Sequence, residues 1–368
     1  MHLYVHVPFC ARRCSYCDFA IAVRREVPSR EFAETILREW RDRQADPGWE
    51  DSPELDTIYF GGGTPSRLDP ESLAALLAGF AQDRTVTSGA EITLEANPDD
   101  VSAAAAHAWR AAGVNRVSLG AQSFDARTLA WMHRTHSAAQ IDVAVRTLRS
   151  AGFENLSLDL IYALPAALER DWSADLDRAL ALAPEHLSFY GLTVEDHTAL
   201  GRWTARGEAL PAKEERAALE FLEAHQRLTR AGFEHYEVSN AARPGRRARH
   251  NAAYWARRPF LGLGPSAHSG LGSHRSWNER EWEAYRRRAA TGQPVRLAEE
   301  RLTEEQVELE EWYLGLRTSE GIPVEQLPAG VMANWTKEGW ATRSDGRLRL
   351  TPEGWLRLDA LVASLTHC

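Results

Sequence analysis

Segments with strand character and segments with helix character alternate six times in the first part of the chain. The expected strands are residues 3–7, 55–60, 91–95, 116–120, 155–165 and 186–195, and the expected helices are residues 30–43, 70–82, 101–112, 138–151, 170–181 and 213–231. Such alternation predicts a parallel sheet covered by helices, since parallel neighbours need helical crossovers. The chain is therefore expected to be an α/β protein. Its six units fall short of the eight that close a (β/α) barrel.

Residues that can do chemistry follow the carboxyl ends of these strands. They are the three cysteines 10, 14 and 17, the glycine-rich turn 61–64, Glu95, Gln122 and Asp159. Carboxyl ends of parallel strands meet at one edge of the sheet, which is where α/β proteins bind their ligands. We therefore expect these groups to converge on one mouth.

Cys10, Cys14 and Cys17 lie within eight residues, and the other cysteine, Cys368, ends the chain. Zinc would need a fourth Cys or His nearby, and a disulfide framework needs an even count in a small secreted chain. A cubane iron–sulfur cluster has four irons, so three thiolates would leave one iron open for another ligand. The alternative is three unrelated buried cysteines, which the clustering makes a poor explanation.

Two further features have both a structural and a ligand-binding interpretation. Gly61-Gly62-Gly63-Thr64 can bring backbone N–H groups close to a ligand, although a glycine-rich turn is often only a turn. Asp159 is a charge inside an apolar strand, so it must be paired or hold a ligand. Arg134 is the expected partner, and a structural ion pair and a ligand contact are both open.

A second informative stretch runs from residue 243 to 258 and contains six arginines around His250-Asn251-x-x-Tyr254-Trp255. Neutral imidazole can ligate a metal ion, and guanidinium groups match carboxylates, so this stretch can be interpreted as a ligand site. The alternative is a packed loop histidine beside a solvated basic face. Further on, His268 could be a second residue of the same site or an ordinary core or loop histidine.

The last part of the chain has a different pattern. A helix is expected at residues 303–316, a hairpin at 340–343 and 347–350, and a helix at 352–365, as in a winged-helix module. The acidic run at residues 304–311 argues against DNA binding, so we expect a lid or a protein-contact domain. The expected division is residues 1–200, 201–298 and 299–368.

Charge and hydropathy exclude several classes of protein. The formal net charge of −9 argues against a general nucleic-acid binder, so no nucleic-acid partner is expected. No apolar run approaches 18 residues, so the protein is not expected to be an integral membrane protein. We expect a cytoplasmic protein in a reducing compartment, where thiols stay free to bind iron.

Several of these motifs resemble a known superfamily. Cys10-x3-Cys14-x2-Cys17, with Tyr16 before the last cysteine, resembles the radical S-adenosylmethionine (SAM) superfamily, as do Gly61-Gly-Gly-Thr-Pro65 and Glu95-Ala-Asn-Pro98. The string from Tyr4 to Cys10 resembles the oxygen-independent coproporphyrinogen III oxidase branch. The HNxxYW motif at residues 250–255 resembles the HemW-type heme chaperones of that branch. Phe19 stands where the oxidases typically carry a further cysteine.

The resemblance implies an incomplete six-unit barrel with a small winged-helix-like C-terminal domain. It implies a [4Fe-4S] cluster on Cys10, Cys14 and Cys17. The SAM residues that it implies are Tyr4, Tyr16, Gly62, Gly63, Thr64, Glu95, Gln122, Arg134 and Asp159. The heme residues that it implies are His250, Asn251, Tyr254 and Trp255, and we add Arg246, Arg247 and Arg249 as a hypothesis for the propionates.

Two functions follow from the resemblance. The first is a heme chaperone that binds heme, the cluster and SAM and delivers heme to an acceptor, which the family implies is a membrane respiratory protein. The second is an oxygen-independent coproporphyrinogen III oxidase, in which reductive cleavage of SAM starts the oxidative decarboxylation of two propionates. Phe19 and the HNxxYW motif favour the chaperone, and the SAM residues fit both functions.

Overall fold

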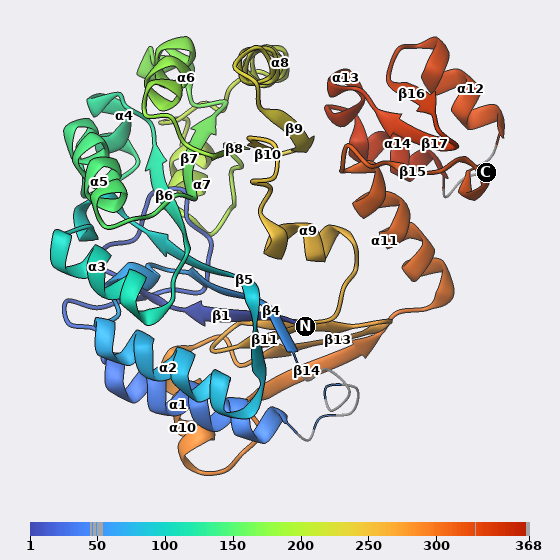
Figure 1. The fold of residues 1–368 in the computed structure, drawn as a ribbon. Coiled ribbons are helices and arrows are strands. Elements are labelled where there is room, and N and C mark those ends of the chain that lie inside the picture. Colours follow the sequence, from blue (N-terminus) through green and yellow to red (C-terminus); the bar gives the residue numbers. More distant parts are fainter. Residues whose placement is uncertain (45, 47–48, 50–53, 328, 366–368) are drawn as a thin grey trace.

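The computed structural model describes residues 1–368 except 45, 47–48, 50–53, 328 and 366–368, so Cys368 lies outside the described residues. Among the described residues, one sheet of twelve strands has the order β14-β13-β12-β11-β1-β4-β5-β6-β7-β8-β10-β9 (Figure 1). Six central strands run parallel: β1 (His2–Val7), β4 (Glu54–Gly62), β5 (Thr85–Ala96), β6 (Arg116–Gln122), β7 (Leu156–Tyr162) and β8 (His186–Gly191). The expected six-unit parallel sheet is confirmed.

Helices cover the outer side of these strands (Figure 1). They are α1 (Ser29–Arg43), α2 (Pro70–Asp83), α3 (Ala103–Ala112), α4 (Ala126–Trp131), α5 (Ala138–Ser150), α6 (Trp172–Ala181) and α8 (Glu214–Arg230). Helix α7 (Ala199–Ala205) instead packs at the cysteine loop, where the Leu200 N–H donates to the Ser15 carbonyl. The core between strands and helices is apolar: Leu3 and Val5 of β1 and Phe32 and Ile36 of α1 are all fully buried in one cluster. Burying that surface is the main force that holds the helices on the sheet.

The start of α1 differs from the expectation. The sequence predicts that Ser29 caps the helix expected at residues 30–43. In the structure Ser29 is the first helical residue, and Pro28 precedes it without a side-chain hydrogen bond. The Ser29 hydroxyl instead accepts a hydrogen bond from the backbone N–H of Asp69. Asp69 itself caps α2, since its carboxylate accepts from the N–H of Ser72. One polar chain therefore joins the beginnings of two neighbouring helices.

The sheet continues past both ends of the parallel part. Beyond β8 lie β10 (Asn240–Ala242) and β9 (Glu234–Glu237), an antiparallel pair where a single strand at 236–240 is expected from the sequence. Beyond β1 lie β11 (Phe260–Leu263), β12 (His268–Leu271), β13 (His274–Asn278) and β14 (Arg296–Arg301). Strand β11 is parallel to β1, and the next three strands are antiparallel.

Helix α9 (Arg249–Trp255) carries the chain from one end of this sheet to the other and lies between them (Figure 1). The sequence predicts a helix over residues 277–288, but Trp277 belongs to β13, and the helix that follows is α10 (Trp282–Ala290). The chain around residue 277 adopts a strand because it pairs with β12 and β14 on both sides. The expectation of a helix beginning at Trp277 was wrong.

The C-terminal module consists of helices and a small antiparallel sheet of order β15-β17-β16 (Figure 1, red). Its elements are α11 (Glu304–Leu316), β15 (Ile322–Pro323), α12 (Ala329–Lys337), β16 (Ala341–Ser344), β17 (Arg347–Leu350), α13 (Pro352–Trp355) and α14 (Leu358–Leu365). The hairpin around Asp345-Gly346 is confirmed, and both turn residues have positive φ, at 52° and 71°. The single helix expected at 352–365 is two helices.

The remaining short elements lie at the ends of larger ones. They are β2 (Phe9–Cys10), β3 (Ala22–Val23) and the 3-10 turns η1 (Pro65–Arg67), η2 (Pro98–Asp100), η3 (Ala166–Leu168) and η4 (Val324–Gln326). The large sheet spans residues 2–301. The division into 1–200, 201–298 and 299–368 stays a prediction.

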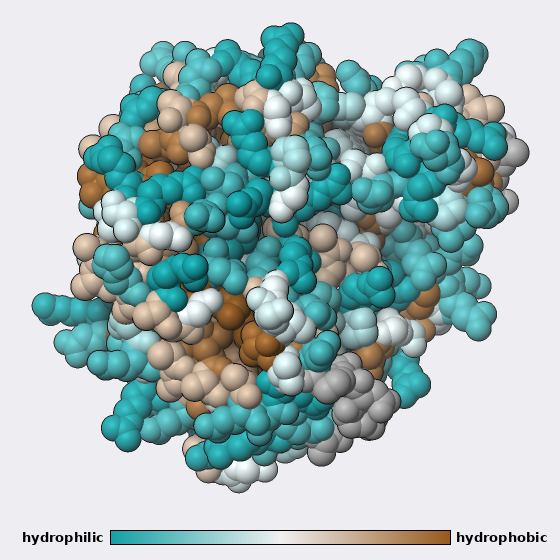
Figure 2. Space-filling view, in the orientation of Figure 1, coloured by the Kyte–Doolittle hydropathy of each residue, from teal (hydrophilic) through white to brown (hydrophobic). Residues whose placement is uncertain are grey.

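Charged and polar side chains cover most of the face seen in Figure 2. Among the described residues, no helix combines the length and the apolar character needed to cross a bilayer.

A buried ionic cluster fixes α8 to the carboxyl end of β7. The Arg170 guanidinium lies 3.4 Å from one Glu220 oxygen and 3.9 Å from Asp175. The same Glu220 oxygen accepts from the N–H of Ala163 at 2.7 Å, and the other lies 2.9 Å from Arg216. Buried charges of this kind depend on every partner being present.

Replacing Glu220 with Ala should lower the free energy of unfolding by about 3–5 kcal/mol, because Arg170 would remain buried with its main partner gone. Urea unfolding followed by circular dichroism measures the change. The matched control is Leu219→Ala, at the neighbouring exposed position of the same helix. The control should change stability by no more than about 0.5 kcal/mol. Equal effects of the two substitutions would show that the cluster contributes little.

Candidate functional site

The three cysteines lie on the loop that follows β1 and line one small cavity of about 90 Å³, here called the thiol cavity. Cys10 is buried, and Cys14 and Cys17 are partly exposed. The Thr64 hydroxyl donates to the Cys10 sulfur at 3.3 Å, and Arg134 Nη1 lies 3.5 Å from the Cys14 sulfur. Burial raises the pKa of the Cys10 thiol to about 11. These donors would favour the sulfurs as thiolates once iron is bound.

The donor set fits an iron–sulfur cluster better than a single metal ion. Within the described part of the chain, no three His, Cys, Asp or Glu side chains come together in a way that could hold one ion. A cubane places each thiolate on a different iron, so its ligands need not meet at a point. The three sulfurs share one cavity with Gly63 and Thr64, and that arrangement leaves a side for a non-protein ligand.

The glycine-rich turn after β4 has room for nothing larger than glycine at two positions. Gly62 has a φ of +111°, and a Cβ there would lie 2.5 Å from the His6 ring. A Cβ on Gly63 would lie 2.8 Å from the backbone of Pro8. The turn therefore packs directly on the loop that carries the cysteines, and its backbone lines the thiol cavity.

Glu95, at the end of β5, is held inside the protein by two donors. Its carboxylate accepts from the Tyr59 hydroxyl at 2.8 Å and from the Gly62 N–H at 3.0 Å. Burial raises the pKa of Glu95 to about 7, against these hydrogen bonds. A positive ligand group beside it would favour the ionised form.

The candidate SAM residues lie around two adjoining cavities. A second cavity of about 480 Å³, here called the inner cavity, is lined by residues of the five parallel strands β4–β8 and by residues of neighbouring loops and α9. The inner cavity is lined by Tyr16, Glu95, Gln122, Asp159 and Asn251, and the thiol cavity by Tyr16, Gly62, Gly63, Thr64 and Arg134. The structure therefore brings all the predicted SAM residues except Tyr4 together at these two cavities.

Gln122 is aimed into the inner cavity by an irregular backbone. It has a φ of +65°, rare for a residue with a side chain, and the β6–β7 register shifts between Leu119 and Gln122. Bulges of this kind redirect a side chain and are common beside functional sites. No motif in the sequence indicates the bulge.

The expected ion pair between Arg134 and Asp159 is absent, and this expectation was wrong. Asp159 accepts from Ser118 at 3.0 Å and from Ser157 at 3.2 Å. Arg134 instead donates to Asn97 at 2.6 Å and to the carbonyl of Gly120 at 2.9 Å. The two are apart because Arg134 faces the thiol cavity, whereas Asp159 lies in the inner cavity among strand hydroxyls.

The HNxxYW motif forms α9, and its histidine is an internal anchor. The two oxygens of Glu91, on β5, accept from the N–H groups of Arg249 and His250, each at 3.0 Å, and so cap the helix. His250 is 1% exposed, with Nδ1 2.7 Å from the Thr57 hydroxyl and Nε2 2.8 Å from the Tyr254 hydroxyl. Burial lowers its pKa to about 3, so the ring is neutral. Both ring nitrogens are therefore occupied, and heme ligation by His250 stays a prediction.

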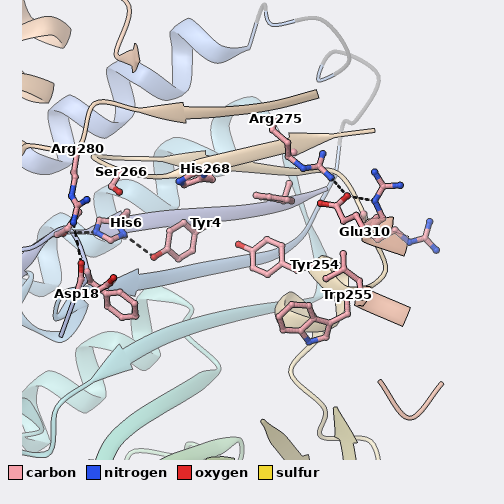
Figure 3. A pocket seen from close by; sticks show the side chains of 18 residues that line it. Tyr4, His6, Asp18, Tyr254, Trp255, Ser266, His268, Arg275, Arg280 and Glu310 are labelled. Atoms are coloured by element: carbon pink, nitrogen blue, oxygen red, sulfur yellow. Dashed lines mark hydrogen bonds and ion pairs between the residues drawn. The ribbon is translucent and has the colours of Figure 1, made fainter. Parts of the chain in front are cut away.

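The other motif residues face two different cavities. Asn251 lines the inner cavity, whereas Tyr254 and Trp255 line a third cavity of about 560 Å³, here called the outer cavity. Figure 3 shows the outer cavity between α9 and the strands β11–β13, with Tyr4 and His6 on β1. Tyr4 therefore lies here and not at the inner cavity, and its hydroxyl is 3.1 Å from His6 Nδ1.

The arginines proposed for heme propionates lie elsewhere. Arg246, Arg247 and Arg249 line a fourth cavity of about 280 Å³, the basal cavity, which they share with residues 89–91. Arg247 is paired with Glu234 and Glu320 at 3.0 Å each. The structure therefore does not bring these arginines together with Tyr254 and Trp255.

Sequence reasoning missed the arginines that do line the outer cavity, which are Arg257, Arg258, Arg275 and Arg280. The first two belong to the basic stretch already singled out, so they could have been chosen. Arg275 and Arg280 reach the cavity only because β12 and β13 fold back antiparallel on β11. No local sequence pattern indicates that β12 and β13 pair antiparallel next to β11.

Phe19 stands at the meeting point of the thiol, inner and outer cavities, and its residue lines all three. Its side chain is 59% exposed. An exposed aromatic ring at such a point is unusual enough to suggest contact with bound groups.

Replacing Glu95 with Gln should change how stability depends on pH. The folded protein holds the Glu95 proton more tightly than the unfolded chain, because its pKa is raised from 4.5 to about 7. The stabilisation is complete below pH 4.5 and is lost as pH rises through 7. The free energy of unfolding of the apoprotein should fall over that window, relative to Glu95→Gln, by up to about 3 kcal/mol.

Urea unfolding of both proteins at several pH values measures this difference. Glu305→Gln, at an exposed position of α11, is the matched control and should follow the unmodified protein at every pH. Parallel curves for the unmodified protein and Glu95→Gln would contradict the raised pKa.

Comparisons with known proteins agree with this geometry. Residues 4–179 match the family model described as the radical SAM superfamily. The chain is 36% identical over 334 residues to the heme chaperone HemW of Synechocystis, covering 89% of this chain and 80% of that one. It is 35% identical over 370 residues to HemW of Mycobacterium tuberculosis, covering 99% and 94%.

The fold has a solved counterpart. Coproporphyrinogen III oxidase (HemN) from Escherichia coli, a radical SAM enzyme, superposes with a TM-score of 0.84 at 20% identity, covering 100% of this chain and 90% of that one. At this identity the likeness concerns the fold. The relatives above, which match nearly the whole length, decide the family: the chain belongs to the HemW family of radical SAM proteins.

Proposed function

We propose that this protein is a heme chaperone that holds heme in the outer cavity, beside a [4Fe-4S] cluster and SAM, and passes it to an acceptor protein. The observation that carries the proposal is the outer cavity itself. Its volume of about 560 Å³ lies within the range of small-molecule sites, and aromatic and arginine side chains line it. The names of the HemW relatives support heme as the cargo.

Cys10, Cys14 and Cys17 are the proposed cluster ligands, and a cubane held this way supplies an open iron for the amino and carboxylate groups of SAM. The chain's own residues would position SAM. Gly62 and Gly63 let the backbone come close, and buried Glu95 offers a negative acceptor for an ammonium or a ribose hydroxyl. Gln122, Asp159 and Asn251 supply polar groups in the inner cavity.

The remaining parts of the proposal rest on the family. A membrane respiratory protein is the acceptor that the resemblance implies, and the C-terminal module 299–368 would be its contact domain. We place the protein in the cytoplasm, because a reducing compartment would keep the three cysteines available to bind iron rather than paired as disulfides.

A second function, oxygen-independent coproporphyrinogen III oxidation, is supported by the fold shared with HemN. The argument against it is Phe19, which stands where those oxidases typically carry a further cysteine. Incubation with SAM, a reductant and coproporphyrinogen III separates the two functions. Release of carbon dioxide with the appearance of a divinyl product would favour the oxidase.

Changing Cys10, Cys14 and Cys17 together to Ala should abolish cluster binding. After anaerobic reconstitution the unmodified protein should hold about four irons per chain, and the triple variant almost none. Iron and sulfide analysis measures both. The matched control is Cys368→Ala, which removes the fourth cysteine and should keep the full iron content. Loss of iron in the control would mean that the cluster has another ligand set.

Tyr254→Ala and Trp255→Ala should each weaken heme binding, because they remove aromatic walls of the outer cavity. An anaerobic heme titration followed by the Soret band measures affinity and stoichiometry. The double variant Arg246→Ala/Arg247→Ala tests the basal cavity in the same assay. Weakening by the double variant alone would move the heme to the basal cavity, and absence of stoichiometric binding by the unmodified protein would refute the chaperone.

A further inference from the structure

We propose that His268, rather than His250, is the axial ligand of the heme iron, and that the arginines around the outer cavity hold the propionates. This inference rests on the proposed function. It follows from which imidazoles face the outer cavity and from the charge that the cavity leaves unpaired.

Two histidines line the outer cavity, and one of them is already occupied. His6 donates from Nε2 to the carbonyl of Ala20 at 2.9 Å, and its Nδ1 accepts from the Tyr4 hydroxyl at 3.1 Å. Its side chain is buried, and together with Gly62 it forms the floor beside the glycine-rich turn. A metal bond at His6 would require breaking one of these two contacts.

In the part of the chain that the structure describes, the imidazole of His268 is not held by hydrogen bonds of the kind that occupy both ring nitrogens of His6. Its side chain is exposed to the outer cavity, and among the described residues neither of its ring nitrogens has a hydrogen-bond partner. Partial burial lowers its pKa, which favours the neutral imidazole that metals bind. An imidazole that is neutral, accessible and free of hydrogen bonds is the form that iron ligation needs.

The backbone and one neighbouring ring hold His268 in place. It begins β12 and pairs with Trp277 of β13, whose ring stacks on the imidazole with centroids 5.8 Å apart and planes 26° apart. On the other side, a Cβ on Gly262 would collide with the carbonyl of His268, so glycine there permits the close approach. Figure 3 shows the ring on the strand side of the cavity, with Tyr4 and Tyr254 between it and Trp255 in this view.

The charges of the cavity match those of a dipropionate. Four arginines and two carboxylates, Asp18 and Glu310, line it. Glu310 is shared by Arg257 and Arg275, at 2.6 Å from each (Figure 3). Arg258 and Arg280 have no ion-pair partner among the described residues. Arg257 also pairs with Glu311 at 2.8 Å, and Arg280 donates to the backbone carbonyl of Asp18 at 3.3 Å. The Arg258 and Arg280 guanidinium groups are therefore the ones left without a carboxylate partner in the described part of the chain, and heme carries two carboxylates.

One protein ligand would leave the opposite face of the heme iron free. An acceptor could then offer its own ligand to that face before the His268 bond breaks. Ligand exchange of this kind moves no electrons and needs no other reactant.

The experiment is a titration of the reconstituted full-length protein with ferric heme, followed by optical and electron paramagnetic resonance spectra. His268→Ala should weaken binding about tenfold or more and remove the signature of imidazole ligation. Added imidazole should restore that signature. His268→Cys should bind heme with a thiolate-type spectrum. His250→Ala is the matched control and should keep the imidazole signature, whatever its effect on affinity.

Each outcome decides something. An unchanged spectrum in His268→Ala, or a normal spectrum in His268→Cys, would overturn the inference while leaving the chaperone function standing. Loss of the imidazole signature in His250→Ala alone would assign the ligand to His250. No stoichiometric binding by the unmodified protein would refute the proposed function itself. Far-UV circular dichroism and iron content check that each variant is folded.

Heme dimethyl ester tests the charge argument with the same ring and iron but without the two negative charges. The unmodified protein should bind it less tightly than heme, by about tenfold or more. The double variant Arg258→Ala/Arg280→Ala should bind both compounds with similar affinity. Arg202→Ala, on exposed α7, is the control and should keep the preference for heme. Equal binding of both compounds by the unmodified protein would overturn the charge argument.

Discussion

The contact between α9 and the sheet positions the residues of the HNxxYW motif. His250 joins the helix to β4 through Thr57 and holds Tyr254 at the next turn. Glu91 fixes the start of the same helix to β5. Asn251 and Trp255 are four residues apart, about 6 Å along the axis of this anchored helix, and Asn251 lines the inner cavity whereas Trp255 lines the outer cavity. The motif therefore contributes residues to both the inner and the outer cavity, and His250 fixes the helix that carries them to the sheet.

The parallel part of the fold and its chemistry could be predicted from the sequence because both follow local patterns. Strand and helix periods are short-range signals, and the ends of parallel strands must meet. Glu95, Gln122 and Asp159 therefore converge as expected. Arg134 and Asp159 share that mouth but not a cavity, because the Cys14 sulfur and the Asn97 amide draw the guanidinium to the thiol side.

The positions of the arginines could not be predicted from the sequence, because they depend on contacts between distant parts of the chain. Arg247 and Trp255 are eight positions apart, yet helix α9 begins after Arg247 and is roughly 10 Å long, so Arg247 lines the basal cavity and Trp255 the outer cavity. The prediction placed Arg246, Arg247 and Arg249 beside Trp255 because they are close to it in the sequence, and this placement differs from the structure. The positions of Arg275 and Arg280 depend on antiparallel strands added beyond β11, and nothing near these residues encodes which strand they will meet. The same holds for the acidic run of α11, where Glu310 and Glu311 pair with Arg257 across the chain.

Phe19 lines the thiol, inner and outer cavities together. A bound group that displaced the ring in one cavity would change the space left in the other two, and so would change the free energy of filling them. Thermodynamic linkage makes such an effect mutual: if SAM changes the affinity for heme, heme changes the affinity for SAM by the same factor. A cysteine at this position would be smaller than the phenylalanine ring and would leave less side chain between the three cavities. With heme and SAM bound as proposed, the aromatic residue would couple the binding of one to the binding of the other.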